Sequence, residues 1–208
     1  MIERAEAIKE LKKLEGKDLR PLADKFNVTV WKGDKLNKGW TGHVIERYLG
    51  LQLTSTQSPD FGSWELKIVP LTHSHSGEIV VKETMAITMI NPDNVLQKDF
   101  EDSHLLAKLK KIVVCARMFE SKKENTAIFV NACVFDLNDP IIYNQIKSDY
   151  DIVRETLKNK GFEALTGAMG VLVQPRTKGP GHGSISRAFY ARTKLVSHII
   201  GLSKWKSD

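Results

Sequence analysis

The sequence predicts an α+β fold in which helices flank a mixed β-sheet. Segments rich in β-branched and aromatic residues occur among helical patterns, and Gly, Pro and Asn punctuate the boundaries between them. Neither an internal repeat nor a low-complexity segment is recognisable. With 208 residues, 41% of them hydrophobic, the chain is long enough for one globular domain or two small lobes with a sizeable core.

The first fifty residues are predicted to be largely helical. Helices are expected over residues 2–14, 18–26 and 41–49. Pro21 fits the first turn of the second helix, and Gly50 fits the end of the third. A loop rich in Lys, Gly and Asn is expected over 32–39.

A strand is predicted over residues 64–69, Trp-Glu-Leu-Lys-Ile-Val, ending at Pro70. Because side chains alternate along a strand, Glu65 and Lys67 share the face opposite the apolar residues and are expected to face a cleft or water. Asp60 precedes the strand across a turn at Gly62, so it can lie beside Glu65.

Two carboxylates and one ammonium group in this arrangement suit metal-dependent phosphodiester chemistry. Close carboxylates repel each other, and a divalent cation relieves that repulsion. Mg²⁺ prefers a few carboxylates together with water and phosphate oxygens, and it acidifies water. Lys67 would orient the nucleophile or neutralise the phosphate. The alternative is an exposed strand with an ordinary ion pair, since Glu-x-Lys is common.

The remaining elements follow from the same patterns. Strands are expected over 78–90, 111–116, 126–137, 171–174 and 187–191, and helices over 103–110, 140–160 and 193–202. The turn at 73–77 predicts a hairpin, and its His73 and His75 are expected to be exposed rather than metal-bound. Strand 126–137 is apolar almost throughout and is therefore predicted to be central. Asp139 caps the 140–160 helix, and Gly161 ends it.

The net charge of +6 comes entirely from the carboxy-terminal region. Residues 164–207 contain no Asp or Glu and carry seven Lys and Arg residues. A basic region with Gly and aromatic residues is suited to phosphate contact. The alternative is a solvated basic tail or a membrane-surface helix, but the interleaved apolar residues at 184–190 favour folded structure.

Cys115 and Cys133 lie in apolar, strand-like runs and are predicted to be core thiols rather than a disulfide or a metal pair. The sequence contains neither an apolar run of membrane-spanning length nor an amino-terminal signal peptide. These features predict a protein of the reducing cytoplasm without a membrane partner.

Several motifs together resemble the MutH/Sau3AI-type DNA endonucleases, a branch of the PD-(D/E)xK nuclease superfamily. They are Gly39-Trp40-Thr41-Gly42 with Glu46, Asp60 with Glu65-Leu66-Lys67 and Pro70, Ser103-His104, Lys108–Lys111, Gln174-Pro175-Arg176 and Arg187–Tyr190. They occur in the family's order and cover most of the chain. The resemblance implies one restriction-endonuclease-like domain over 1–208, with two lobes around a DNA cleft. The catalytic lobe is expected over 1–135 and the DNA-reading lobe over 136–208.

The resemblance also implies residue roles. Asp60, Glu65 and Glu46 would hold Mg²⁺, for which Mn²⁺ can substitute. Lys67 would be the catalytic lysine, and Lys110, or alternatively Lys108, a second one. Arg176 and Tyr190 would lie on the DNA-reading side, and the basic carboxy-terminal region adds Lys178, His182, Arg187 and Lys194 as expected DNA-binding residues. Tyr190 would lie near the adenine whose methylation the family senses.

The implied function is a sequence-specific, Mg²⁺-dependent endonuclease acting on double-stranded DNA. A type II restriction enzyme at a GATC-like site, pairing with a second copy on DNA, is favoured slightly. Gln174 and the segment 179–183 depart from MutH and leave the target open. One alternative is a methyl-directed mismatch-repair nicking enzyme recruited by an activator protein. A different class, a non-catalytic DNA-binding or allosteric domain, would have no need for Asp60, Glu65 and Lys67 together.

Overall fold

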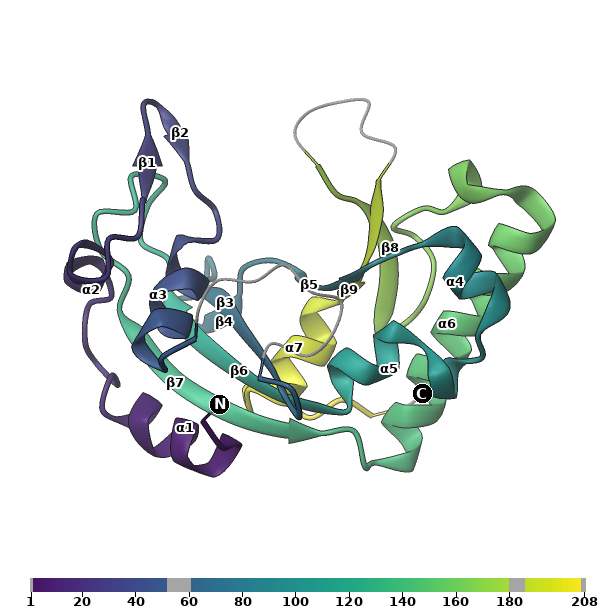
Figure 1. Cartoon of the computed structure of the whole chain (residues 1–208), viewed down its shortest axis with the longest axis horizontal. Helices are drawn as coiled ribbons and strands as arrows, with labels where there is room; N and C mark the ends of the chain where they lie inside the picture. Colours follow the sequence, from purple (N-terminus) through teal and green to yellow (C-terminus); the bar gives the residue numbers. More distant parts are fainter. Residues whose placement is uncertain (1, 52–60, 180–185, 207–208) are drawn as a thin grey trace. The chain divides into compact units, whose positions relative to one another are not determined.

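The computed structural model describes residues 2–51, 61–179 and 186–206 (Figure 1). The chain divides into two compact units. The first contains residues 1–82 and 112–135, and the second contains residues 83–111 and 136–208. Both units combine helices with a β-sheet, so the predicted α+β class is confirmed. Among the described residues, no helix has the length and apolar character needed to cross a membrane.

Among its described residues, the first unit holds three helices, a mixed four-stranded sheet and a separate two-stranded pair. Its elements are α1 (Arg4–Lys12), α2 (Arg20–Lys25), β1 (Trp31–Lys32), β2 (Lys35–Leu36), α3 (Trp40–Tyr48), β3 (Glu65–His73), β4 (Ile79–Val81), β6 (Lys111–Met118) and β7 (Phe129–Asp136). The sheet order is β4-β3-β6-β7. β3 pairs with β6 in parallel and with β4 in antiparallel orientation, which makes the sheet mixed, as predicted.

β6 and β3 are the inner strands of this sheet, and β7 lies at its edge. The prediction that 126–137 forms a central strand is therefore wrong. β6 is buried along nearly its whole length, whereas Val134 on β7 is 47% exposed. Apolar composition alone does not distinguish an inner strand from an edge strand whose faces are partly covered.

Two predictions for the first unit are corrected by the structure: the strand end at Pro70 and the loop over 32–39. β3 continues through Pro70, whose carbonyl accepts a hydrogen bond from the Lys82 amide at 3.0 Å. Pro70 lies just beyond the last β3–β4 pair, Leu71 with Val81, where a missing amide donor is tolerated. The expected loop at 32–39 contains the short antiparallel pair β1–β2.

The predicted strand 78–90 is two strands in two different sheets. β4 ends at Val81, and β5 (Met85–Met89) belongs to the second unit. The polar residues 82–84 separate them. The β3–β4 hairpin itself is confirmed, since the Ser74 amide donates to the Glu78 carbonyl at 2.8 Å.

The second unit combines a three-stranded antiparallel sheet with helices. Besides β5, its elements are α4 (Pro92–Gln97), η1 (Phe100–Asp102), α5 (His104–Leu109), α6 (Pro140–Lys160), η2 (Phe162–Ala164), β8 (Val173–Thr177), β9 (Arg187–Ala191) and α7 (Thr193–Ile199). β9 is the middle strand, between β5 and β8. The predicted strand 171–174 begins and ends later than expected, so Arg176 lies within β8.

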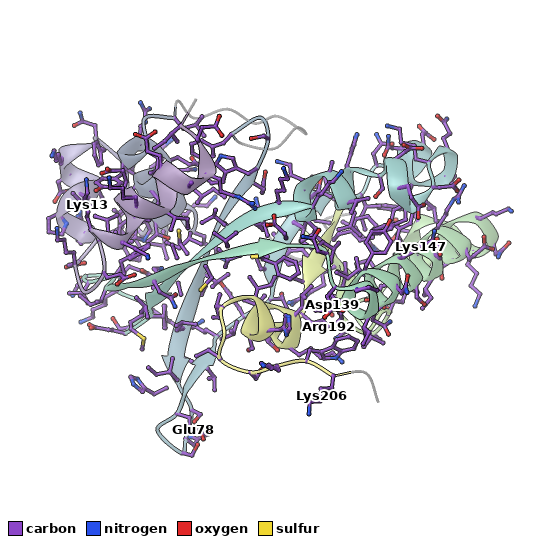
Figure 2. All side chains as sticks on the ribbon, turned by 90° about the horizontal axis from the view of Figure 1, so that it is seen from below. Lys13, Glu78, Asp139, Lys147, Arg192 and Lys206 are labelled. Carbon is purple, nitrogen blue, oxygen red and sulfur yellow. The ribbon has the colours of Figure 1, made fainter. Side chains whose placement is uncertain are left out.

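α6 packs against this sheet through aromatic contacts. The Tyr150 ring on α6 stacks on the Phe189 ring of β9, with centroids 5.8 Å apart. Asp139, labelled at the start of α6 in Figure 2, accepts hydrogen bonds from the amides of Ile141 and Ile142. Gly161 follows the helix with φ +80°, as a glycine stop requires. Both predicted ends of this helix are confirmed.

Candidate functional site

Glu65 and Lys67 form an ion pair at the start of β3 in the first unit. The Lys67 ammonium donates to the Glu65 carboxylate. The Lys67 side chain is 22% exposed, whereas the Glu65 side chain is 0% exposed. Strand alternation predicts that Glu65 faces a cleft or water, and the structure shows that its side chain is not open to water. Burying a carboxylate is costly unless positive charge and hydrogen bonds compensate it, so a buried Glu at this position requires cationic surroundings.

The chain entering β3 is fixed by aromatic packing. The rings of Phe61 and Trp64 stack with centroids 4.1 Å apart, and the Phe61 amide donates to the Trp64 carbonyl at 3.0 Å. Gly62 between them has φ +71°, the conformation that a tight turn at this position demands. The indole of Trp64 also donates to the Ile2 carbonyl. This tight turn places Glu65 as the first residue of β3. Asp60 lies outside the described residues.

Glu46 lies on α3, the helix that packs against β3. The apolar face of α3 is buried through Trp40, Val44 and Ile45. Gly42 faces the strand, because a Cβ atom added there would lie 3.6 Å from Ile68 Cγ2. Glu46 is half-buried and has interactions of its own. One element thus carries Glu46 and its neighbour carries the Glu65–Lys67 pair.

The donor set of this unit suits a hard divalent cation. Glu65 and Glu46 offer carboxylate oxygens, which Mg²⁺ and similar ions prefer. Within residues 2–51, 61–179 and 186–206, no cluster of three or more His, Cys, Asp or Glu side chains is arranged around a common point. Asp60, the third predicted ligand, is not among those residues. His73 and His75 are both exposed, as predicted.

Two lysines considered for catalysis belong to the second unit. Lys110 follows α5 and is exposed, whereas Lys108, on α5 itself, is 4% exposed. A buried ammonium group is costly unless nearby polar or charged groups compensate it. Lys108 has an interaction within the chain. The two alternatives therefore differ sharply in environment: Lys110 is open to solvent and Lys108 is enclosed.

Arg176 and Tyr190 lie on neighbouring strands of the second unit's sheet. The Arg176 guanidinium lies over the Tyr190 ring, 5.7 Å from its centroid, and donates to Thr84 Oγ1 at 2.7 Å. Tyr190 is half-buried. Burial raises the pKa of its phenol, Arg176 opposes that rise and Glu83 adds to it. The phenol is therefore protonated at neutral pH and can donate a hydrogen bond.

The other predicted DNA-binding residues differ in how much of their surface is available. Lys178 and Lys194 are exposed, although Lys178 has an interaction within the chain. Lys194 lines a shallow hollow of about 380 Å³, together with Thr84, Gly170, Val171, Arg192 and Thr193. His182 lies outside the described residues.

Arg187 is 8% exposed and bonds to the chain itself. Its Nε donates to the Leu165 carbonyl at 2.9 Å, and its guanidinium lies 5.2 Å from the Phe162 ring centroid. Arg192, labelled in Figure 2, donates to the carbonyls of Gly167, Met169 and Gly170. Both arginines hold the segment before β8, a role that their charge alone did not indicate.

Comparison with known proteins identifies sequence relatives. A family model described as the DNA mismatch repair enzyme MutH matches residues 49–149. The type II restriction enzyme Sau3AI of Staphylococcus aureus is 25% identical over 172 residues, which cover 81% of this chain but 35% of Sau3AI. The chain thus spans about a third of that relative's length. The DNA mismatch repair protein MutH of Vibrio cholerae strain M66-2 is 23% identical over 218 residues, covering 94% of both chains.

A solved complex of the restriction endonuclease MvaI with cognate DNA aligns over 94% of this chain and 96% of MvaI. Its TM-score is 0.40 at 14% identity.

Proposed function

The chain is of the MutH/Sau3AI type, and on that premise we propose that it is a sequence-specific DNA endonuclease that hydrolyses phosphodiester bonds with the help of a divalent metal ion. Nucleases of the restriction-endonuclease type generally use such ions. Mg²⁺ is the metal in this proposal, with Mn²⁺ as a substitute. The observation that carries the proposal is the Glu65–Lys67 pair, in which a fully buried carboxylate meets an ammonium group at the start of a strand.

The proposed ligands are Glu65, Glu46 and Asp60. When bound, a divalent cation supplies two effects: it lowers the pKa of a water molecule and neutralises charge that develops on the phosphate. Glu65 suits this role because its carboxylate oxygens are hard donors fixed at the start of β3. Glu46 suits it because its helix packs on β3. Asp60 precedes Glu65 by five residues in the sequence.

Lys67 is the proposed catalytic lysine. Its ammonium group pairs with Glu65, and 22% of the Lys67 side-chain surface is exposed. A phosphate oxygen or an attacking water can therefore approach the side chain. Lysine is a compact charge on a flexible stem, which lets it shift between the carboxylate and a phosphate. Lys110, exposed after α5, is the proposed second lysine that stabilises the phosphate charge.

Double-stranded DNA is the proposed partner of the second unit, through its basic segment 164–207, which contains no Asp or Glu. Arg176, Tyr190, Lys178 and Lys194 are the proposed contacts, with His182 in the intervening segment. An arginine beside an aromatic ring offers both hydrogen bonds to base edges and charge for phosphates. We assign Arg187 an indirect role, because its guanidinium bonds to the Leu165 carbonyl and packs on Phe162.

Two biological settings are compatible with this chemistry. A restriction enzyme would cut both strands and therefore needs two active sites, which a second copy on DNA would provide. A mismatch-repair nickase would cut one strand and would respond to an activator protein. The alignment with MutH covers 94% of both chains, so the nickase remains a candidate together with the restriction enzyme. A cytoplasmic location accompanies either setting.

The test is digestion of DNA that carries GATC sites in unmethylated, hemimethylated and fully methylated form. Each substrate is incubated with Mg²⁺, with Mn²⁺ or with EDTA, and the ends are mapped. Metal-dependent cleavage at defined positions is expected, and nicks or double-strand breaks distinguish the two settings. An absence of site-specific cleavage on all three substrates would reject the endonuclease proposal. Binding without cleavage would favour a non-catalytic DNA-binding domain.

A further inference from the structure

One face of the second unit's sheet carries a polar contact that spans all three strands. Gln174 and Arg176 on β8 lie opposite Tyr190 and Ala188 on β9, and Ala86 on β5 lies opposite Tyr190 from the other side. Paired residues project to the same face of a sheet. Phe189, adjacent to Tyr190, points to the other face, where it stacks on Tyr150 of α6.

Arg176 crosses this face from one edge strand to the other. It starts on β8, passes over the Tyr190 ring on β9 and ends at the hydroxyl of Thr84, the residue before β5. Two strand spacings, roughly 10 Å, separate β8 from β5. An extended arginine side chain covers most of that distance, so the bond to Thr84 fixes its far end. Both the middle and the end of the side chain are therefore held.

Although it contacts Tyr190 and Thr84, the Arg176 guanidinium remains suited to binding a ligand. It has five N–H donors, and the bond to Thr84 uses one of them. Arg176 remains exposed, while Tyr190 beneath it is half-buried. An arginine that keeps one orientation loses less conformational entropy when it binds a phosphate or a base edge.

We propose that Thr84 is a positioning residue for DNA recognition, because its hydroxyl holds the Arg176 guanidinium over Tyr190 in the orientation that meets the duplex. This inference rests on the proposed function, and it adds a residue that lies 92 positions before Arg176 in the sequence. Thr84 itself does not contact the DNA in this account. It acts through Arg176.

The test is a double-mutant cycle measured by cleavage kinetics and by fluorescence anisotropy of a labelled duplex. Thr84→Val keeps the shape of the side chain but removes the acceptor, and we expect it to raise KM and Kd about fivefold while kcat changes little. Thr84→Ser retains the hydroxyl and is expected to restore wild-type values. On an Arg176→Ala background, Thr84→Val is expected to have no further effect.

Thr177→Val is the matched control, since Thr177 is an exposed threonine on β8 next to Arg176. Thermal unfolding of each variant separates lost positioning from lost folding, and Thr84→Ala is the second variant if Thr84→Val does not fold. Equal KM and Kd for Thr84→Val and wild type would overturn the inference. So would an undiminished effect of Thr84→Val on the Arg176→Ala background. A wild-type protein that neither binds nor cuts DNA would instead overturn the proposed function, and this inference with it.

Discussion

Asp149→Ala is expected to destabilise the second unit severely. Asp149 on α6 is 1% exposed, and its carboxylate accepts three backbone hydrogen bonds, from the amides of Val171, Leu172 and Val173, each 2.7 Å long. Gln145 donates a fourth, at 3.0 Å. The Asp149 carboxylate therefore fixes the backbone of the segment that leads directly into β8, the strand that carries Arg176.

The size of the effect follows from the amides left without a partner. A buried donor that loses its acceptor costs about 1–3 kcal/mol, and the Val171 amide, which is only partly buried, is at the low end. Three such groups, with some relaxation and water entry, give a loss of about 3–5 kcal/mol in the free energy of unfolding. For a chain of this size that corresponds to roughly 6–20 °C in Tm.

The assay is urea unfolding followed by circular dichroism, with thermal melts as a second measure. Asp151→Ala is the matched control, because Asp151 is two residues further along α6 and half-buried, and it is expected to cost less than about 1 kcal/mol. A loss below about 1 kcal/mol for Asp149→Ala would refute the reasoning, since it would mean that water satisfies the three amides as well as the carboxylate does.

Three further predictions concern the backbone, the thiols and the charge of the chain. Gly170→Ala should lower Tm by several degrees more than Gly201→Ala. Both glycines have positive φ, but only at Gly170 would an added Cβ meet another atom, the Val173 carbonyl oxygen, at 1.9 Å. Equal losses of Tm in differential scanning calorimetry would contradict this. Burial raises the pKa of the Cys115 and Cys133 thiols, so their thiolates form only at more alkaline pH. A disulfide reagent at pH 8 should therefore react slowly with the native protein and fast with the unfolded protein. Rapid reaction of both thiols in the native protein would contradict this. DNA affinity should fall steeply with salt because residues 164–207 carry seven positive and no negative side chains; a flat plot of log Kd against log salt concentration would remove that region from the interface.

Local rules predicted most helices correctly. α6 was predictable at both ends, because Asp139 is a side-chain cap, Pro140 fits the first turn and Gly161 stops the helix. α5 and α7 also lie within their predicted ranges, and α3 begins at Trp40, one residue before its predicted start. Both cysteines are free; Cys115 is a buried core residue, as predicted, whereas Cys133 is half-buried. These signals act over a few residues, so the sequence displays them directly.

Sheet membership was harder to predict, because it depends on pairing between distant segments. A single strand is predicted over 78–90, but its two parts, β4 and β5, join different sheets. β7 reads as an inner strand and is an edge strand, since β6 takes the inner position beside β3. Hydrophobic patterning describes which faces are covered and leaves strand order undetermined.

The candidate site was predictable where the motif is local and not where it depends on distant contacts. Glu65 and Lys67 are two residues apart, so strand alternation alone brings them together, although it did not predict the complete burial of Glu65. Thr84 was missed, since its bond to Arg176 joins residues 92 positions apart. Arg187 stays a predicted DNA contact, but its burial and its bonds to Leu165 and Glu163 could not be predicted, because they join residues that are far apart in the sequence.

The central claim is that the Glu65–Lys67 pair belongs to a nuclease active site. The most direct measurement is site-specific DNA cleavage by Glu65→Gln in Mg²⁺, with Kd for the same duplex measured in parallel. Glu78→Gln, an exposed glutamate in the β3–β4 hairpin of the same unit (labelled in Figure 2), is the matched control. We predict that Glu65→Gln lowers the cleavage rate at least about a hundredfold while Kd stays within about threefold of wild type, and that Glu78→Gln changes neither. Undiminished cleavage by a folded Glu65→Gln variant would contradict the account.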